Sequence, residues 1–130
     1  MLTVAPEERV LLDIVERDPR YGLGAYEFTR EAVTYASEVV FATGTHVTGR
    51  ELLEAIRRFA RERYGLLAPD VLRSWGVHRT EDFGEIVFNL VDARLLSKTP
   101  EDSKEDFRQV YSFEEAFDPA SYWREVLESS

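Results

Sequence analysis

Residues 68–113, APDVLRSWGVHRTEDFGEIVFNLVDARLLSKTPEDSKEDFRQVYSF, decide the expected fold of this chain. Their first part predicts a short helix over 68–75 that ends at Gly76, because glycine readily adopts the left-handed backbone that closes helices. Thr80 predicts the N-cap of a second helix, whose apolar residues recur at helical spacing. Two later runs, 95–98 and 107–113, predict strands, the second because apolar and polar residues alternate in it.

This order of elements is similar to that of a winged helix-turn-helix, with residues 99–106 as the wing loop. Thr99-Pro100 is also a permitted helix start, so a helical turn over 99–106 remains the alternative. The face of the second helix that would meet DNA carries Glu81, Glu85, Asn89 and Asp92. Since acidic side chains repel phosphate, the outline predicts a scaffold more than a DNA reader, and Asn89 is expected to face solvent.

The other elements are expected to be helices, because apolar residues recur at helical spacing between capping signals. One runs from Pro6 to about Asp18, a second over about 25–41, and a third from the capping box of Thr48 and Glu51 to about Tyr64. A last helix follows Asp118-Pro119. The aromatic residues that lie off the apolar stripe of the second helix are expected either to be buried or to meet a partner, and burial is favoured; they are Tyr26, Tyr35 and Phe41.

The fold class expected from these elements is mainly α (α+β), in one domain over residues 1–130. Residues 1–47 would form an N-terminal helical pair, residues 48–117 a winged-helix-like core with a short β-hairpin, and residues 118–130 a C-terminal helix. A chain of 130 residues is long enough to bury a substantial core, and its 44% hydrophobic and 12% aromatic content is typical of a globular protein.

Composition also limits the chemistry. The chain has no cysteine, which excludes disulfides and thiolate zinc sites. No glycine-rich phosphate loop is expected, because Gly22-Leu23-Gly24 lacks a preceding strand and a third glycine. No cofactor is predicted. The N-terminus does not have the pattern of a secretory signal, and no apolar run is long enough for a membrane span, so a cytoplasmic protein is expected.

The net charge of −9 is unevenly distributed along the sequence. Residues 77–130 are strongly acidic, whereas residues 48–76 carry the only basic cluster, formed by Arg50, Arg57, Arg58, Arg61 and Arg63. This cluster is able to bind a nucleic acid, an acidic protein or the acidic C-terminal half of this same protein, within one chain or across a dimer. Pairing within the protein is favoured over nucleic acid, because the net charge opposes long-range attraction to phosphate.

Groups that could support metal or acid–base chemistry are few and match no established motif. His46, His78 and Asp82 are weak candidates for a metal site, with Glu81 nearby in sequence. Glu85 follows a glycine and lies beside an apolar stripe, which gives a weak hint of a perturbed carboxylate. The simpler interpretation is that Glu81 and Asp82 stabilise the start of a helix while His78 is a solvated turn residue.

A longer likeness is carried by the segment WGVHRTEDFGEIVFNLV at 75–91, followed by LLSKT at 95–99 and EDF at 105–107. The chain resembles a small bacterial family of hypothetical proteins over most of its length, and the Thr-Glu-Asp-Phe-Gly-Glu run is fairly specific. That family has no assigned activity, so the resemblance implies a shared fold and provides no catalytic residues.

The function expected from the sequence is a non-catalytic protein-interaction or structural module, with a protein partner or self-association as a homodimer. The alternatives are a nucleic-acid-binding transcriptional regulator and a metal-dependent enzyme around His78, Glu81 and Asp82. Trp75 and Trp123 are expected as contact residues or as core, because tryptophan often anchors interfaces. The full candidate interaction surface comprises Arg50, Arg57, Arg61, Trp75, Glu81, Glu85, Asn89 and Trp123.

Overall fold

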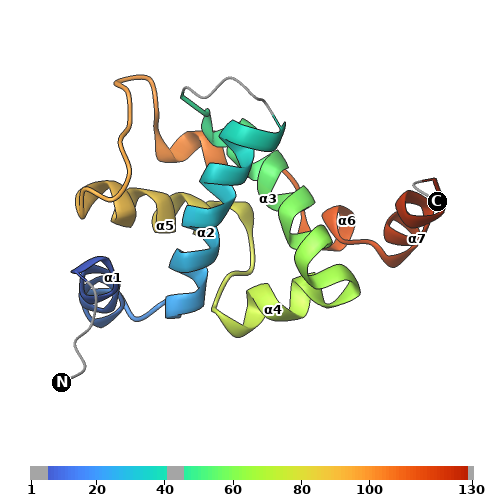
Figure 1. Ribbon diagram of the computed structural model, residues 1–130, viewed down its shortest axis with the longest axis horizontal. Helices are drawn as coiled ribbons and strands as arrows, with labels where there is room; N and C mark the ends of the chain where they lie inside the picture. The colour runs from blue at the N-terminus through green and yellow to red at the C-terminus, as the bar shows by residue number, and fades with distance from the viewer. Residues whose placement is uncertain (1–5, 41–45, 129–130) are drawn as a thin grey trace.

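The computed structural model describes residues 6–40 and 46–128, and the protein is mainly helical (Figure 1). The helical elements are α1 (Pro6–Arg17), α2 (Leu23–Tyr35), the π-helical turn η1 (Ala36–Val40), α3 (Gly49–Tyr64), the 3₁₀ turn η2 (Gly65–Leu67), α4 (Ala68–Ser74), α5 (Thr80–Asp92), the 3₁₀ turn η3 (Lys104–Phe107), α6 (Phe113–Ala116) and α7 (Pro119–Glu128). No strand occurs in these two described ranges.

Several helix ends form where the sequence predicts them. The Thr48 and Glu51 capping box is confirmed, because the Glu51 N–H donates to Thr48 Oγ1 at 3.2 Å and the Thr48 N–H donates to Glu51 Oε1 at 2.9 Å. Gly65 and Gly76 close α3 and the α4 segment with φ of +56° and +87°. These two values lie in the left-handed region that favours glycine.

The predicted strands over 95–98 and 107–113 are wrong, and without a hairpin there is no wing. Residues 104–107 form the 3₁₀ turn η3, and Gln109 has a φ of +46°, which breaks any extended run. The alternating apolar residues have another cause, since the chain lies across helices. The Phe107 ring packs where α5 has Gly84, and the Tyr111 hydroxyl donates to the Leu53 carbonyl of α3 at 2.7 Å.

Residues 99–102 form a turn, which supports the helical-turn alternative for this loop. The Asp102 N–H donates to the Thr99 carbonyl at 3.1 Å, and the Thr99 N–H donates to Asp102 Oδ2 at 2.8 Å. A second cap follows, in which the Ser103 N–H donates to Asp106 Oδ2 at 3.1 Å. Local side-chain caps of this kind compete with extended structure, so the loop folds into two short turns.

The core lies between α2, α3 and α5. Its largest fully buried side chains include Tyr26 on α2, Leu53 and Ile56 on α3, and Phe83 and Ile86 on α5. Aromatic rings fill the space beside them, with Phe28 against Phe59, Tyr64, Trp75 and Phe83 at centroid distances of 5.3–6.5 Å. Ring pairs of this geometry stabilise a core beyond the area they bury.

One of the predicted off-stripe aromatic residues is buried, as the sequence favours, and a second is half-buried. Tyr26 is fully buried, and Tyr35 is half-buried with its ring 5.0 Å from that of Phe59. Phe41 lies outside the described residues. The Tyr26 ring therefore packs fully inside the molecule, and the Tyr35 ring does so in part.

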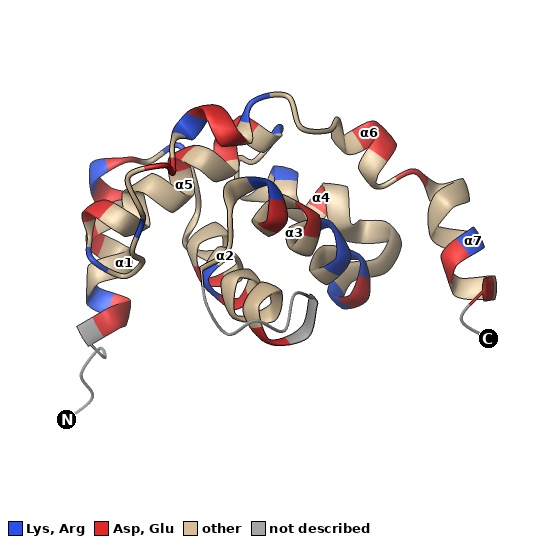
Figure 2. Ribbon diagram, turned by 90° about the horizontal axis from the view of Figure 1, so that it is seen from above, with Lys and Arg blue, Asp and Glu red and all other residues tan. Residues whose placement is uncertain are grey.

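Helices α1 and α7 lie at opposite ends of the molecule (Figures 1 and 2). Helix α1 packs on α2 and buries Leu11 and Ile14. Helix α7 contacts η2 but has no buried residue of its own. Within the described ranges, no helix combines the length and the apolar composition that crossing a lipid bilayer requires.

Candidate functional site

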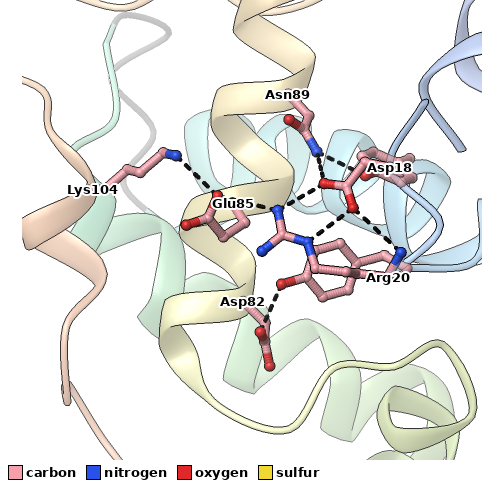
Figure 3. Close-up of polar contacts among 8 residues, drawn as sticks. Asp18, Arg20, Asp82, Glu85, Asn89 and Lys104 are labelled. Carbon is pink, nitrogen blue, oxygen red and sulfur yellow. Dashed lines mark hydrogen bonds and ion pairs between the residues drawn. The ribbon is translucent and has the colours of Figure 1, made fainter.

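The connection between α1 and α2, residues 18–22, crosses the face of α5 and is called here the α1–α2 elbow (Figure 3). The Asn89 Nδ2 group donates to Asp18 Oδ2 at 2.9 Å and to the Tyr26 hydroxyl oxygen at 3.0 Å. Asp18 also accepts from Arg20 Nε at 2.9 Å and Nη2 at 2.7 Å. These hydrogen bonds, first from Arg20 and then from Asn89, outweigh desolvation and hold the pKa of Asp18 well below its usual value.

A second contact joins the elbow to the start of α5. The Tyr21 hydroxyl donates to Asp82 Oδ1 at 2.7 Å, while Asp82 Oδ2 accepts from the backbone N–H groups of His78 and Arg79 at 2.8 and 3.2 Å. Burial, together with the Asp82 carboxylate, raises the pKa of Tyr21 above its usual value. The phenol therefore stays protonated and serves as a donor.

The predicted cap at Thr80 is wrong, because Arg79 holds the N-cap position and the Asp82 carboxylate accepts from the N–H groups of His78 and Arg79, just before α5. Thr80 is fully buried, and its hydroxyl oxygen accepts from the Val110 N–H at 3.3 Å. The Thr80 hydroxyl also donates to Glu81 Oε1 at 3.3 Å. Thr80 thus fastens the 107–113 segment to α5.

Glu85 occupies the middle of the same α5 face. Its Oε2 atom lies 2.9 Å from Lys104 Nζ and 3.4 Å from Arg20 Nη2. The Lys104 contact is the main cause that lowers the pKa of Glu85, and Arg20 adds to it. The Glu85 carboxylate therefore joins α5 to both the elbow and η3.

These contacts change the interpretation of α5. Helices α3, α4 and α5 follow one another as in a helix-turn-helix, but Asp82, Glu85 and Asn89 point into the elbow (Figure 3). The expectation that Asn89 faces solvent is wrong, because its amide makes two hydrogen bonds in a half-buried position. A helix must present a free face to read a major groove, and the elbow covers this one.

The basic cluster on α3 pairs with acids of the same chain, as the sequence favours. Arg61 Nη1 lies 2.6 Å from Glu125 Oε1 on α7, and Arg57 Nη1 lies 3.6 Å from the same oxygen. Glu54 of α3 binds both Arg57, at 2.9 Å, and Arg58, at 3.4 Å. Figure 2 shows basic segments recurring along α3 and acidic segments on α6 and α7.

The other members of the cluster differ. Arg63 forms an ion pair with Glu31 of α2 and lies over the Phe59 ring, whereas Arg50 is exposed near the start of α3. Pairing within the chain thus involves most of the cluster and leaves little of the basic surface that phosphate binding needs.

Arg61 is the charged side chain with the greatest burial in this group, since its side chain is only 6% exposed. Apart from the ion pair with Glu125, its guanidinium nitrogens have no hydrogen-bond partner among the described residues. A buried charge with so few hydrogen bonds contributes little net stability, and removing its partner is costly.

We therefore expect Glu125→Gln to lower the free energy of unfolding by about 2 kcal/mol, and Arg61→Met to leave it unchanged or raise it by about 1 kcal/mol. Urea denaturation followed by circular dichroism measures both. In the Arg61→Met background, Glu125→Gln should cost almost nothing, because no buried charge is left unpaired. An equal cost of Glu125→Gln in both backgrounds would contradict this account.

A cavity of about 250 Å³ lies on the other side of α5, between α2, η1, the start of α3 and residues 96–107. At its rim, His46 Nε2 lies 3.1 Å from Asp102 Oδ1 and 2.9 Å from Asp102 Oδ2. Burial acts to raise the pKa of Asp102, but hydrogen bonds from Thr99 and the contact with His46 outweigh it and lower the pKa. His46 is a candidate predicted from the sequence, whereas Asp102 is not, and its only local signal is the Thr99 cap.

The remaining predicted residues are dispersed. Trp75 is half-buried among rings, its centroid 5.6 Å from Phe28 and 6.1 Å from Tyr64. Trp123 on α7 is 53% exposed. His46 contacts Asp102, whereas Asp82 is engaged by Tyr21 and backbone amides. Over residues 6–40 and 46–128, no three histidine or carboxylate side chains are grouped as metal ligands.

The comparisons with known proteins leave the resemblance to a bacterial family a prediction. No family model matches the chain, and neither the curated proteins nor the solved structures contain a match.

Proposed function

We propose that the protein is a non-catalytic interaction module that forms a homodimer through its C-terminal helix. The observation that carries this proposal is an apolar stripe on α7, formed by Trp123, Val126 and Leu127, which are 53%, 39% and 72% exposed. The stripe has the i, i+3, i+4 spacing of a helix face made for packing. We call these three residues the α7 stripe.

Two residues of the α7 stripe, Trp123 and Leu127, are turned away from the face of α7 that meets its own chain. Successive residues of an α-helix are about 100° apart, so these two residues lie roughly 130–170° from the middle of the face that Tyr122 and Glu125 share, with Val126 between the two faces. Tyr122 packs against Gly65, and Glu125 pairs with Arg61. The face with Tyr122 and Glu125 therefore meets its own chain, while Trp123 and Leu127 are turned away from it.

Two further leucines extend this surface. Leu66 and Leu67 of η2, which α7 contacts, are 43% and 63% exposed. Five of the six large hydrophobic side chains exposed among the described residues thus lie at one end of the molecule. Exposed apolar residues gathered at one end of a molecule often mark an interaction site.

A second copy of the chain fits this surface. An isolated helix of 10 residues is marginal in water, so α7 needs cover on its apolar face. Two α7 helices that cross in antiparallel fashion about a two-fold axis would place Trp123 of one copy on Leu127 of the other. Arg124 would approach Glu128 of the second copy, so the pairing complements charge as well as shape.

The alternatives have less support. A protein that binds nucleic acid needs a free helix face or a basic surface. The contact of Asn89 with the elbow covers the helix face, and the pairing of Arg61 with Glu125 neutralises part of the basic surface. The metal-enzyme alternative requires Asp82, which is already hydrogen-bonded to Tyr21 and to the His78 N–H.

Sedimentation equilibrium over a range of concentrations tests the proposal. We expect a dimer with a Kd on the order of 10 µM, in keeping with a small apolar interface. Leu127→Glu should abolish dimerisation, since it places a charge against Trp123 of the second copy. Circular dichroism should show that the variant remains helical.

Leu12→Glu is the matched control, because Leu12 is also exposed, at 46%, but lies on α1 at the opposite end. This variant should dimerise like the unchanged protein. A chain that stays monomeric at about 1 mM, or a dimer that survives Leu127→Glu, would overturn the proposal.

A further inference from the structure

The cavity beside α5 has an apolar wall and a polar rim. Its wall is formed by Val33, Leu52, Val87, Val91, Leu96 and Phe107. The π-helical turn η1 contributes Ser37 to the lining, and π-helical turns within helices frequently occur at functional sites. An apolar pocket with a few polar groups at its mouth is the usual form of a small-molecule site.

The volume limits the size of the ligand. At about 250 Å³ the cavity is slightly smaller than the roughly 300–1,000 Å³ of drug-sized ligand sites. A liquid water takes up roughly 30 Å³, so the cavity accommodates about eight buried non-hydrogen atoms. A short aliphatic chain or a single substituted ring fits, whereas a nucleotide or a long lipid chain does not.

The rim determines the head group. Its two carboxylates are already engaged, because Asp102 accepts from the Thr99 N–H and contacts His46, and Asp106 accepts from the Ser103 N–H. Lys98 also lines the cavity and forms no ion pair or hydrogen bond with any described residue. An ammonium group has three donors and no acceptor, so its complement is an acceptor with negative charge.

We propose that this cavity binds a medium-chain aliphatic carboxylate, with the chain against Val87 and Val91 and the carboxylate at Lys98. A ligand of this class supplies about eight apolar atoms for the wall and an anion for Lys98. Binding here is independent of the dimer proposed above, because the lining residues do not include any residue of α7 or η2.

Isothermal titration calorimetry with octanoate tests the proposal on the intact chain. We expect a Kd on the order of 0.1 mM, given the ligand's ten non-hydrogen atoms. Octanol, which lacks the charge, should bind at least about tenfold more weakly, and octylamine, which reverses it, more weakly still. Backbone amide shifts in a nuclear magnetic resonance titration should cluster at residues 87–98.

Two variants separate head-group from tail recognition. Lys98→Ala should weaken octanoate binding about tenfold and leave octanol binding unchanged. Lys104→Ala is the matched control, because Lys104 is also exposed but pairs with Glu85 and does not line the cavity. Val91→Trp should fill the space and remove binding of both ligands, and amide spectra report whether this variant remains folded.

Three outcomes would overturn the proposal. One is the absence of octanoate binding at millimolar concentration, and another is octylamine that binds as tightly as octanoate. The third is octanoate binding that survives Val91→Trp but is lost in Leu127→Glu, since the ligand would then sit on the exposed α7 stripe.

Discussion

Substitution of Gly76 by alanine is expected to lower the free energy of unfolding by about 3–5 kcal/mol, the sum of backbone strain and overpacking. Gly76 has a φ of +87°, and a Cβ atom built there would lie 2.3 Å from the Arg20 carbonyl oxygen. That oxygen belongs to the backbone of the α1–α2 elbow and cannot rotate away. Domains commonly have a free energy of unfolding of about 5–15 kcal/mol, so this substitution would remove a large fraction of it.

Gly22→Ala is the matched control for this experiment. Gly22 lies in the same elbow with a φ of −76°, and the nearest atoms to its added Cβ are 3.8 Å away, on Trp75. Its substitution should change the free energy of unfolding by less than about 1 kcal/mol. Urea denaturation compares the two variants. Equal losses of unfolding free energy would show that an added Cβ atom at Gly76 does not clash with the elbow.

Asn89→Asp is the second large effect expected. The substitution keeps the size of the side chain but replaces the amide that donates to Asp18 Oδ2 at 2.9 Å with a carboxylate. Two like charges at about 4 Å repel by about 4 kcal/mol at the effective dielectric constant of a protein surface. The contact with Tyr26 survives, because the Tyr26 hydroxyl can donate to the new carboxylate. Repulsion from Asp18 dominates, and we expect a destabilisation of about 3–4 kcal/mol at pH 7.

The pH dependence of this variant distinguishes repulsion from lost hydrogen bonds. The lowered pKa of Asp18 in the unchanged protein contributes stability above pH ~4, and that stability is lost as the pH falls. In the variant, one carboxylate of the new pair has a raised pKa, so its penalty disappears as the pH falls through that value.

The difference in unfolding free energy between the two proteins should therefore narrow as the pH falls from 7 to about 3. Asn89→Ala is the control, because it removes the amide without adding charge and should cost about 1–3 kcal/mol at pH 7. If Asn89→Asp and Asn89→Ala lose the same unfolding free energy relative to the unchanged protein at every pH, charge repulsion at this site is contradicted.

The parts of the fold that the sequence predicts are those determined by neighbouring residues. The Thr48 capping box, the Gly76 turn and the start of α7 at Pro119 each depend on a few adjacent side chains, and each forms as expected. Local hydrogen bonds and backbone preferences are sufficient for these features.

The two strand predictions are wrong because alternating apolar and polar residues do not occur only in strands. Phe107 and Phe113 are buried in a segment that crosses α5, and an irregular chain lying on helices alternates its contacts in the same way. Gln109, with its φ of +46°, gives no local sign of this backbone in the sequence.

The elbow contacts could not be predicted because both partners look ordinary in isolation. Asn89 is one polar residue beside the apolar stripe of α5. The sequence around Asp18 predicts only that α1 ends there, before Pro19. Their pairing depends on where α1 and α2 pack, which no local pattern determines. The one available signal was Tyr26, a polar-tipped ring off the stripe of α2, because a buried tyrosine hydroxyl requires a partner.

The elbow also affects the order in which this chain acquires its structure. Tyr21, Tyr26 and Asp18 lie 61, 63 and 71 residues ahead of their hydrogen-bond partners on α5. At a translation speed of roughly 5–20 residues per second, about 4–14 s separate the synthesis of Asp18 from that of Asn89. Isolated helices of 12 and 13 residues are marginal in water, so α1 and α2 are synthesised long before the surface that stabilises them and fixes their angle exists. During that interval a nascent chain exposes Leu11 and Ile14, and a ribosome-associated chaperone has its best opportunity to bind there.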